Sequence, residues 1–463
     1  MTTKLKYNLS LFIFRRDLRL DDNLGLIAAL TLSEKVIPIF ILTPEQLINN
    51  KYKSDNCVQF MIENLKLLDS QLHKKGSKLF YTYGNPVEVI EAIYNTTPYD
   101  AIFVNKDYTP YSVKRDANID KFCKTKQIFF ESYEDILLNP VGSITNVQGY
   151  VYTKFTPYFH QAKKVKINKP IKCTKTNFVN PNYKIAKMYD KTKLTKFYKH
   201  NENLAYHPSD ITKQLSNIKN LKKYNTNRNF LTYETTGLSV FIKFGTVSIR
   251  QVYHIMLKHL GSKNDLIKQL YWREFYYNVA YTHSYIFDKK GNLNKKYDKI
   301  RWWGKNAQLN RWKNATTGFP IVDACMRQMN TTGYMHNRGR LIVASFLVKI
   351  LLVDWKKGEK YFATKLIDYD PSVNTGNWGW VSGSGADAQP YFRIFNPWLQ
   401  SKKYDANAEF IKKWIPELEN VEPAHIHKWY QYCEEYKNIK YPKPFVSYEE
   451  QVKEVRKMYG VIY

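Results

Sequence analysis

The sequence predicts an α/β N-terminal domain with a parallel sheet, followed by an all-α C-terminal domain. Three observations lead to this prediction. Short apolar segments alternate with helical patterns over residues 1–135, which is typical of a parallel sheet. From about residue 205 the chain changes to long stretches with apolar residues at helical spacing. All ten Trp lie within residues 272–429, so the two parts also differ in composition.

The N-terminal part contains five short apolar segments that have the character of buried strands. Residues 57–75 and 86–95, which lie between them, have helical spacing instead. Strand and helix in alternation favour a sheet covered by helices. The expected strands are 9–14, 36–42, 78–84, 101–105 and 128–133.

A lysine-rich segment follows the predicted sheet. Residues 160–204 contain twelve Lys and two acidic residues, with little periodicity. This pattern predicts a long, solvated connection between domains. We therefore expect an α/β unit at 1–135, a connection at 136–204 and a helical unit at 205–463.

Long helices dominate the predicted C-terminal domain. Residues 368–380, "DYDPSVNTGNWGW", are an exception, because they are too polar and too rich in Gly for a simple core segment. They have the character of a Trp-rich loop. The expected helices lie within 246–260, 264–283, 321–333 and 337–355.

The net charge of +30 favours a polyanionic partner, with nucleic acid as the first candidate. A second interpretation stays open, because a lysine-rich composition can also reflect an A/T-rich coding sequence. Only 14 of the 71 basic residues are Arg. Where the chain keeps Arg, its planar, bidentate side chain is the more informative signal.

Several classes of protein are excluded. No run of eighteen apolar residues exists, and the first residues do not resemble a signal peptide, so we expect an intracellular protein without membrane spans. The five Cys are scattered and form no CxxC, and His425 and His427 are predicted to lie on the surface, so no metal site is expected. The glycine-rich residues 382–389 follow no strand and are not a phosphate-binding loop.

A Trp-rich helical domain that keeps Arg favours a large planar cofactor and redox chemistry.

Four segments carry a resemblance to a known family: "FRRDLRLDDN" (14–23), "YWREFYYN" (271–278), "TGFPIVDACMRQMNTTGYMHNR" (317–338) and "NTGNWGWVSGSGADAQPYFRIFNP" (374–397). They resemble the photolyase/cryptochrome family, and most of all its class I cyclobutane pyrimidine dimer photolyases. The resemblance implies a Rossmann-like N-terminal domain that can hold an antenna chromophore and a helical domain that binds FAD. It also implies light-driven splitting of pyrimidine dimers in UV-damaged DNA, by a monomer.

The resemblance assigns cofactor contacts residue by residue. Arg340 and Asp368 match the pair beside the flavin ring, and Asn374 matches the residue opposite flavin N5. Without the resemblance, residues 235–239 would be interpreted as an ordinary helix cap. The implied FAD-binding residues are Tyr224, Thr235, Thr236, Gly237, Leu238, Ser239, Arg273, Arg340, Asp368, Asp370 and Asn374.

Aromatic side chains have two implied roles. Trp302, Trp355 and Trp378 match the family's electron-transfer chain, with Trp355 expected to end one helix and Trp378 to begin another segment. Trp272 and Trp380 match the wall that holds a flipped-out lesion. The implied contacts to DNA or lesion are Arg228, Gln269, Trp272, Asn337, Arg338, Trp380, Arg393 and Gln400.

Two positions bear on which lesion the protein would repair, and they favour different lesions. Asn337 stands where (6-4) enzymes have a His, which favours the cyclobutane dimer. Gln269 stands where cyclobutane enzymes usually have Glu, and Leu341 replaces a common Met. A (6-4) photolyase and a cryptochrome-type blue-light receptor therefore remain alternatives, as does a light-independent nucleic-acid-binding protein. Ser112 falls where folate-binding members use Glu, which weakens the interpretation as a folate site. The second chromophore, if there is one, can therefore be a folate, a deazaflavin or another flavin.

Overall fold

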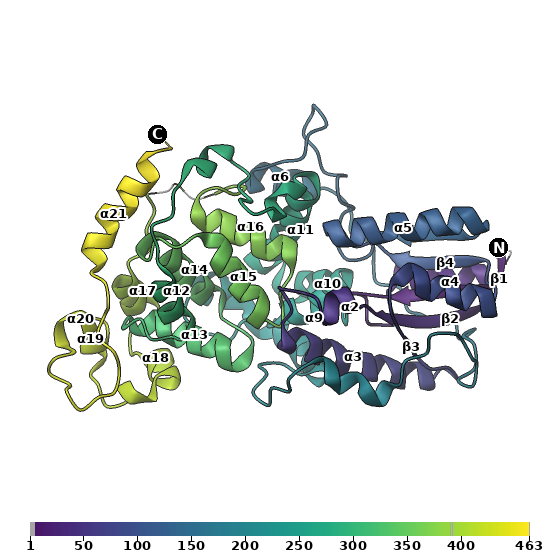
Figure 1. Ribbon diagram of the computed structural model, residues 1–463, viewed down its shortest axis with the longest axis horizontal. Coiled ribbons are helices and arrows are strands. Elements are labelled where there is room, and N and C mark those ends of the chain that lie inside the picture. Colours follow the sequence, from purple (N-terminus) through teal and green to yellow (C-terminus); the bar gives the residue numbers. More distant parts are fainter. Residues whose placement is uncertain (1–4, 389, 391, 463) are drawn as a thin grey trace.

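A five-stranded parallel sheet forms the N-terminal part of the computed structural model (Figure 1), which describes residues 5–388, 390 and 392–462. The strand order is β3-β2-β1-β4-β5, so the chain first builds outward on one side of β1 and then crosses to the other. All five predicted strands are present within a few residues of their expected ends. Their bounds are β1 Tyr7–Phe14, β2 Ser33–Leu42, β3 Phe80–Tyr83, β4 Ala101–Asn105 and β5 Phe129–Tyr133.

Helices cover both faces of this sheet because its apolar residues alternate between them. Phe12 and Phe14 of β1 belong to a buried cluster shared with α1 (Leu24–Leu32) and α3 (Asp55–His73). Leu11 and Ile13 belong to a second cluster, shared with α4 (Pro86–Thr96) and α5 (Pro110–Lys126). Sequence analysis located α3 and α4, whereas it did not identify α1 and α5.

One of the two edge strands, β5, differs from the prediction of five buried strands. Phe129 of β5 is 59% exposed, because β5 is an uncovered edge of the sheet. The opposite edge, β3, is covered by the lysine-rich segment, where the Tyr189 N–H donates to the Tyr81 carbonyl at 2.8 Å. Phe178 and Phe197 of that segment are buried. The predicted connection is therefore solvated along its Lys side chains but anchored by its apolar residues.

Helices α10, α11, α13 and α14 occupy the regions where the C-terminal pattern predicts them. The single helix expected at 337–355 is interrupted, because α14 passes into the π-helical turn η6 and Leu352 adopts a left-handed φ of 54°. Trp355 consequently begins a helix instead of ending one. The bounds are α9 Leu238–Phe244, α10 Ile249–Leu260, α11 Asp265–Thr282, α12 Asn306–Lys313, α13 Pro320–Thr332, α14 Asn337–Ser345, η6 Phe346–Ile350 and α15 Trp355–Lys365.

The segment expected to be a Trp-rich loop is helix α16, Pro371–Ser382. Asp370 caps its first turn by accepting the Val373 N–H at 3.2 Å, and Pro371 occupies the first helical position. A Cβ on Gly376 would lie 2.2 Å from the Tyr276 ring of α11. The glycine therefore permits close packing of two helices, and it does not break the helix.

The remaining helices are short or lie near the C-terminus. The last of them, α21, packs against η6 and lies near the C-terminus in Figure 1. Their bounds are α2 Pro44–Leu47, α6 Phe155–Ala162, α7 Ile211–Asn217, α8 Tyr224–Asn227, α17 Pro397–Tyr404, α18 Glu409–Trp414, α19 Pro423–Ile426, α20 Trp429–Tyr432 and α21 Tyr448–Gly460, with 3-10 turns η1 Lys191–Phe197, η2 Pro208–Asp210, η3 Ile218–Lys223, η4 Ser284–Phe287, η5 Lys295–Lys299 and η7 Pro416–Leu418.

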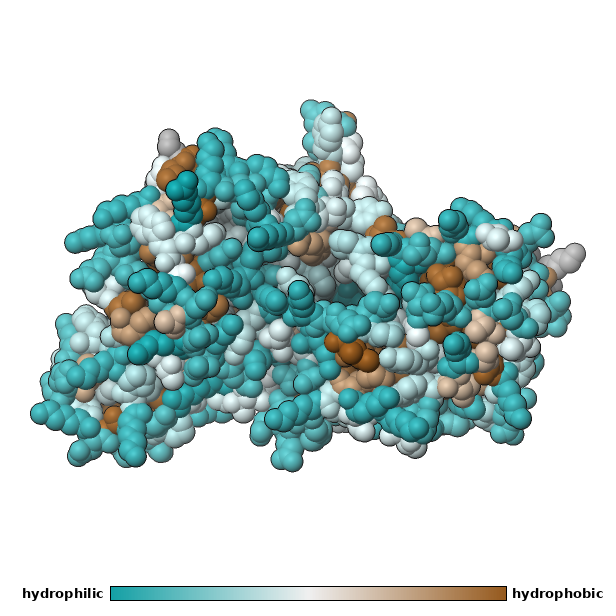
Figure 2. All heavy atoms as spheres, viewed as in Figure 1, coloured by the Kyte–Doolittle hydropathy of each residue, from teal (hydrophilic) through white to brown (hydrophobic). Residues whose placement is uncertain are grey.

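The sheet domain and the helical part share one continuous apolar core. Phe60 of α3 contacts Phe241 and Phe244 of α9 with ring centroids 5.5 and 5.3 Å apart. The facing surface in Figure 2 is largely hydrophilic and is hollowed between the two parts. Within the described residues, the helices are too short or too polar to cross a bilayer.

Candidate functional site

Two cavities of about 480 Å³ each lie in the molecule. The first, here called the inter-domain pocket, lies between the carboxyl ends of the strands and the helical part. The second, the helical pocket, lies among helices of the C-terminal part. Lys243 and Tyr369 line both, so the two cavities share a wall.

The helical pocket gathers most of the site residues that the family resemblance implied. They come from separate helices and loops, so their proximity is a result of the tertiary fold. Seventeen of them line it: Tyr224, Arg228, Thr235, Thr236, Gly237, Leu238, Ser239, Gln269, Trp272, Arg273, Asn337, Arg340, Asp368, Asp370, Asn374, Trp378 and Trp380.

Arg340 and Asp368 form the predicted ion pair in the wall of the helical pocket. The Arg340 Nη2 atom donates to both carboxylate oxygens of Asp368, at 2.9 and 3.1 Å. Ser239 Oγ donates to the same carboxylate at 2.7 Å. Arg340 is half-buried, which would lower its pKa, but the Asp368 carboxylate outweighs this desolvation and raises that pKa. The pair is therefore a fixed dipole beside the cavity.

The start of α9 contributes hydroxyl groups and backbone N–H groups to the cavity. Gly237 has a left-handed φ of 61°, and a Cβ there would lie 2.5 Å from the Tyr206 ring. Glycine is required at this turn on both counts. Thr235, Thr236 and Ser239 flank the turn and line the pocket, which gives a set of donors suited to phosphate oxygens.

The amide of Asn374 is held in one orientation. Its Nδ2 atom donates to the backbone carbonyl of Glu359 and to Glu359 Oε1, each at 3.1 Å. Both amide hydrogens are thus engaged within α15, and the carbonyl oxygen Oδ1 is left as the polar atom for the pocket. Asn374 therefore presents an acceptor, whereas the sequence left donor and acceptor equally available.

Partly exposed side chains surround the mouth of the helical pocket. Trp272 stacks on Phe155 of α6 with ring centroids 3.7 Å apart and an interplanar angle of 8°. This contact covers one face of the indole. Trp380 and Gln269 are half-buried and Asn337 is exposed, all on the same cavity. The mouth thus combines aromatic surface with two carboxamides.

The three tryptophans of the implied electron chain lie at different depths. Trp378 is 2% exposed and lines the pocket, Trp355 is 1% exposed, and Trp302 is half-buried. A Cβ on Gly358 would lie 2.3 Å from Trp378, so the first turn of α15, which Trp355 begins, packs directly on that indole. Trp302 packs against the apolar cluster to which Trp355 and Trp378 belong.

Three implied DNA contacts do not line the pocket. Arg338 donates to Asn229 Oδ1 at 2.5 Å and lies over the Tyr404 ring. Gln400 is half-buried and Arg393 is exposed. Arg228, which does line the pocket, lies 3.6 Å from Asp265. Gln389 and Tyr391, which belong to the fourth motif, lie outside the described residues.

The structure gives Asp370 a different set of partners from the one expected of a cofactor ligand. Its carboxylate lines the pocket but is engaged by Arg16, by the Tyr277 hydroxyl and by the Val373 N–H. Burial alone would raise its pKa, but Arg16 and Arg273 outweigh burial and hold the pKa at about 2. Asp370 is therefore ionised and occupied within the protein.

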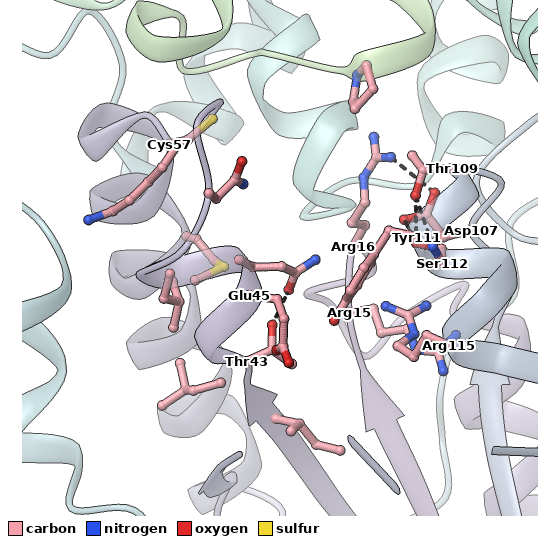
Figure 3. A pocket seen from close by; sticks show the side chains of 18 of the residues that line it. Arg15, Arg16, Thr43, Glu45, Cys57, Asp107, Thr109, Tyr111, Ser112 and Arg115 are labelled. Carbon is pink, nitrogen blue, oxygen red and sulfur yellow. Dashed lines mark hydrogen bonds and ion pairs between the residues drawn. The ribbon is translucent and has the colours of Figure 1, made fainter. Parts of the chain in front are cut away.

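The inter-domain pocket lies at the carboxyl ends of β1, β2 and β4, where ligands bind in open parallel sheets. Figure 3 shows Arg15, Arg16 and Arg115 on one side, and Thr43 with Glu45 on the other. Ser112, the residue aligned with the folate-binding Glu, also lines this pocket. Its Oγ donates to Asp107 at 3.0 Å, so this hydroxyl is engaged within the protein.

Sequence reasoning missed several functional candidates. Glu359 and Lys243 lie in none of the four motifs, and only contacts between distant segments reveal them. Tyr334 lies within the third motif, but the resemblance gave it no role. Asn377 also lines the helical pocket, and here the sequence did offer a signal, because Asn377 lies about one helical turn after Asn374. His427 was expected on the surface but is buried, since its ring bonds Ser401 at 2.7 Å and the Ala406 carbonyl at 2.9 Å.

A Rossmann-like sheet domain joined to a helical domain with a deep Trp-, Arg- and Asn-lined cavity defines a class of two-domain flavoproteins. Comparison with known proteins agrees with this class. A family model described as the FAD binding domain of DNA photolyase matches residues 266–460, and one described as DNA photolyase matches residues 10–175.

Individual relatives extend over nearly the whole chain. A deoxyribodipyrimidine photo-lyase of Buchnera aphidicola is 34% identical over 95% of this chain and 96% of the relative. The crystal structure of a photolyase from Sulfolobus tokodaii, with two FAD molecules, is 39% identical with a TM-score of 0.88, covering 98% of this chain and 99% of that one. A Synechocystis cryptochrome is 27% identical with a TM-score of 0.89, covering 98% and 100%. The chain belongs to the photolyase/cryptochrome family, and the predicted fold class and FAD-binding domain are confirmed.

Proposed function

We propose that this chain is a light-driven DNA repair enzyme that splits cyclobutane pyrimidine dimers in UV-damaged DNA. The observation that carries the proposal is the helical pocket, where lesion-type residues at the mouth meet cofactor-type residues in the interior. The relatives named deoxyribodipyrimidine photo-lyase support the same reaction. When bound, reduced FAD supplies the electron that light transfers to the dimer.

Each group of residues has a role in this proposal. Trp272 and Trp380 stack against the flipped-out dimer, while Gln269 and Asn337 bond its carbonyls. Arg340, Asp368, Asn374 and the 235–239 turn hold the cofactor. Trp302, Trp355 and Trp378 return the flavin to its reduced form by carrying electrons from the surface.

The decisive experiment illuminates the reduced enzyme with oligonucleotides that carry one defined lesion. Blue-light loss of the cyclobutane dimer, with the (6-4) product unchanged, is the expected result. Repair of the (6-4) product alone would replace the proposed substrate, an outcome to which Gln269 points. Tight flavin binding without repair of either lesion would favour a receptor, the role suggested by the likeness to a cryptochrome.

We also propose that the inter-domain pocket holds a second, light-harvesting chromophore. Its position at the strand ends and its volume of about 480 Å³ support this role. The Sulfolobus tokodaii photolyase contains two FAD molecules, which makes a flavin the first candidate. Chromophores released from the purified protein and separated by chromatography would identify it. A single FAD per chain and no other chromophore, under conditions that retain bound ligand, would contradict the proposal.

A further inference from the structure

Arg16 belongs to the sheet domain but reaches the helical domain. It follows β1 and lines the inter-domain pocket, where Figure 3 shows its side chain extending along the wall toward Asp107. Its Nη1 atom donates to Asp107 at 3.3 Å, and its Nε atom donates to the Lys243 carbonyl at 3.1 Å. Its Nη2 atom forms the ion pair with Asp370. The Arg16 side chain thus connects Asp107, which follows β4, with α9 and with the start of α16.

Asp370 transmits this contact to the helix that carries the site. Its side chain caps α16, and its backbone carbonyl accepts the Asn374 N–H at 2.8 Å. The following turns of α16 place Trp378 and Trp380 on the helical pocket. The orientation of this carboxylate therefore fixes where α16 begins.

The groups around Asp370 leave Arg16 with a special role. Arg273 and Tyr277 of α11, Lys243 of α9 and Asp107 after β4 all face it. Arg273 donates its Nη1 to the Ile136 carbonyl at 2.7 Å and lies over the Tyr277 ring. It contributes charge from a distance, whereas Arg16 bonds the carboxylate directly. A buried carboxylate without its bonded cation would tend to protonate.

We propose that Arg16 is a positioning residue for the helical pocket: by holding the Asp370 carboxylate, it sets the start of α16 and thereby the placement of Asn374, Trp378 and Trp380. This inference rests on the proposed binding of FAD in that pocket. The inference goes beyond the proposed function because it makes Arg16, a residue of the sheet domain in the wall of the inter-domain pocket, part of the cofactor site in the helical pocket.

The test compares Arg16→Gln with Arg327→Gln, a matched loss of an arginine whose bidentate partner Glu417 lies away from both pockets. FAD affinity of the apo-protein is measured by flavin fluorescence from pH 6 to 8.5. We expect Arg16→Gln to bind FAD about tenfold more weakly, with affinity falling further toward pH 6 as Asp370 protonates. Wild type and Arg327→Gln should have flat profiles.

A second measurement needs no cofactor. Hydrogen exchange of residues 371–380 in the apo-protein should be faster in Arg16→Gln than in wild type or Arg327→Gln. If Arg16→Gln does not fold, Arg16→Lys replaces it, since a single ammonium cannot reproduce the bonds that Nε, Nη1 and Nη2 of Arg16 make separately to Lys243, Asp107 and Asp370. Unchanged exchange and affinity in the variant that folds would overturn the inference, while FAD binding and repair by wild type would leave the proposed function standing. Failure of wild type to bind FAD would overturn the function, and exchange would still decide the role of Arg16.

Discussion

At the scale of single residues, Gln269 is the proposed lesion contact whose side chain can be tested most directly. The side chain is half-buried at the mouth of the helical pocket, and its Nε2 donates to the Asp265 carbonyl at 3.4 Å. We expect Gln269→Glu to preserve or improve repair of the cyclobutane dimer, because a carboxyl group can bond a thymine carbonyl and also supply a proton. Repair yield per absorbed photon is the measurement, with Gln269→Ala as a variant expected to lose activity. A large loss in Gln269→Glu would show that the site is organised around the amide.

Glu359 controls which atom Asn374 offers to the cofactor. Burial raises the pKa of the Glu359 carboxyl, and the bonds from Asn374 and Thr375 only partly oppose this. In Glu359→Leu the amide can rotate, and the acceptor that we propose to face flavin N5 is no longer fixed. We expect the midpoint potential of bound FAD to fall by on the order of 40 mV, the equivalent of one hydrogen bond. Glu359→Gln keeps an acceptor for Nδ2 and should change the potential less; equal potentials in all three proteins would refute the role.

Trp378 is the tryptophan of the proposed electron chain that borders the pocket. Replacing it with Phe keeps an apolar ring in place but removes the easily oxidised indole. Trp378→Phe should therefore slow photoreduction of oxidised FAD at least tenfold, while enzyme reduced beforehand still repairs. Trp429→Phe changes another fully buried indole, outside both pockets, and serves as the control. Photoreduction by Trp378→Phe at the control's rate would remove Trp378 from the route.

At the scale of elements, the sequence could predict what short-range patterns encode. The strands are continuous apolar runs, and helices such as α10 show a clear 3.6-residue period, so both were predicted within a few residues. Helix α16 could not be predicted, because Gly376 is there to accommodate Tyr276 of another helix. The break after η6 was missed for a similar reason. Leu352 has no sequence signal for its left-handed backbone.

The π-helical turn η6 contains a buried amine that makes the stability of this region depend on pH. Lys349 is 1% exposed, donates to the Ser382 carbonyl at 3.2 Å and lies over the Tyr459 ring of α21. Burial lowers its pKa to about 7. The unfolded chain keeps this proton up to a pKa of about 10.4. Between these two values the unfolded state binds more protons, so stability rises with pH.

Lys349→Met should remove this dependence. From pH 7 to pH 9 we expect wild type to gain about 2 kcal/mol more stability than the variant. Chemical denaturation of both proteins at pH 7, 8 and 9 measures the difference. The variant itself should be at least as stable as wild type at pH 7, because methionine fills a similar volume without a desolvated charge. Parallel pH curves would show that the amine stays protonated in the folded protein.

At the scale of the whole molecule, the sequence predicted the two kinds of domain but not how they are joined. Asp22 and Asp135 of the sheet side meet Arg19 and Arg250 in one buried cluster. Arg250 of α10 lies 228 and 115 residues from its two acidic partners. No local pattern encodes such a pairing. The same limit applies to the helical pocket, whose members the resemblance could name but spacing could not bring together.

This cluster predicts that Arg250 holds the sheet side to the helical part. Burial would raise the pKa of Asp135, but Arg19 and Arg250 outweigh it and lower that pKa. A carboxylate with a lowered pKa contributes stability above its unfolded pKa of about 3.9, and this contribution is lost as pH falls through the folded value. Arg250→Gln removes one of its two cations, and it leaves Asp22 without its bonded guanidinium.

We therefore expect Arg250→Gln to lose roughly 3–5 kcal/mol of stability at pH 7, the usual result of removing one partner from a buried charge pair. Arg327→Gln breaks a partly exposed ion pair by the same substitution and should lose at most about 1 kcal/mol. Denaturant titrations at pH 7 compare the two. The difference in stability loss between the two variants should narrow as pH falls through the folded pKa of Asp135, because protonation removes its uncompensated charge. If the difference in stability loss between Arg250→Gln and Arg327→Gln does not depend on pH, the loss results from packing of the Arg250 side chain and not from its charge.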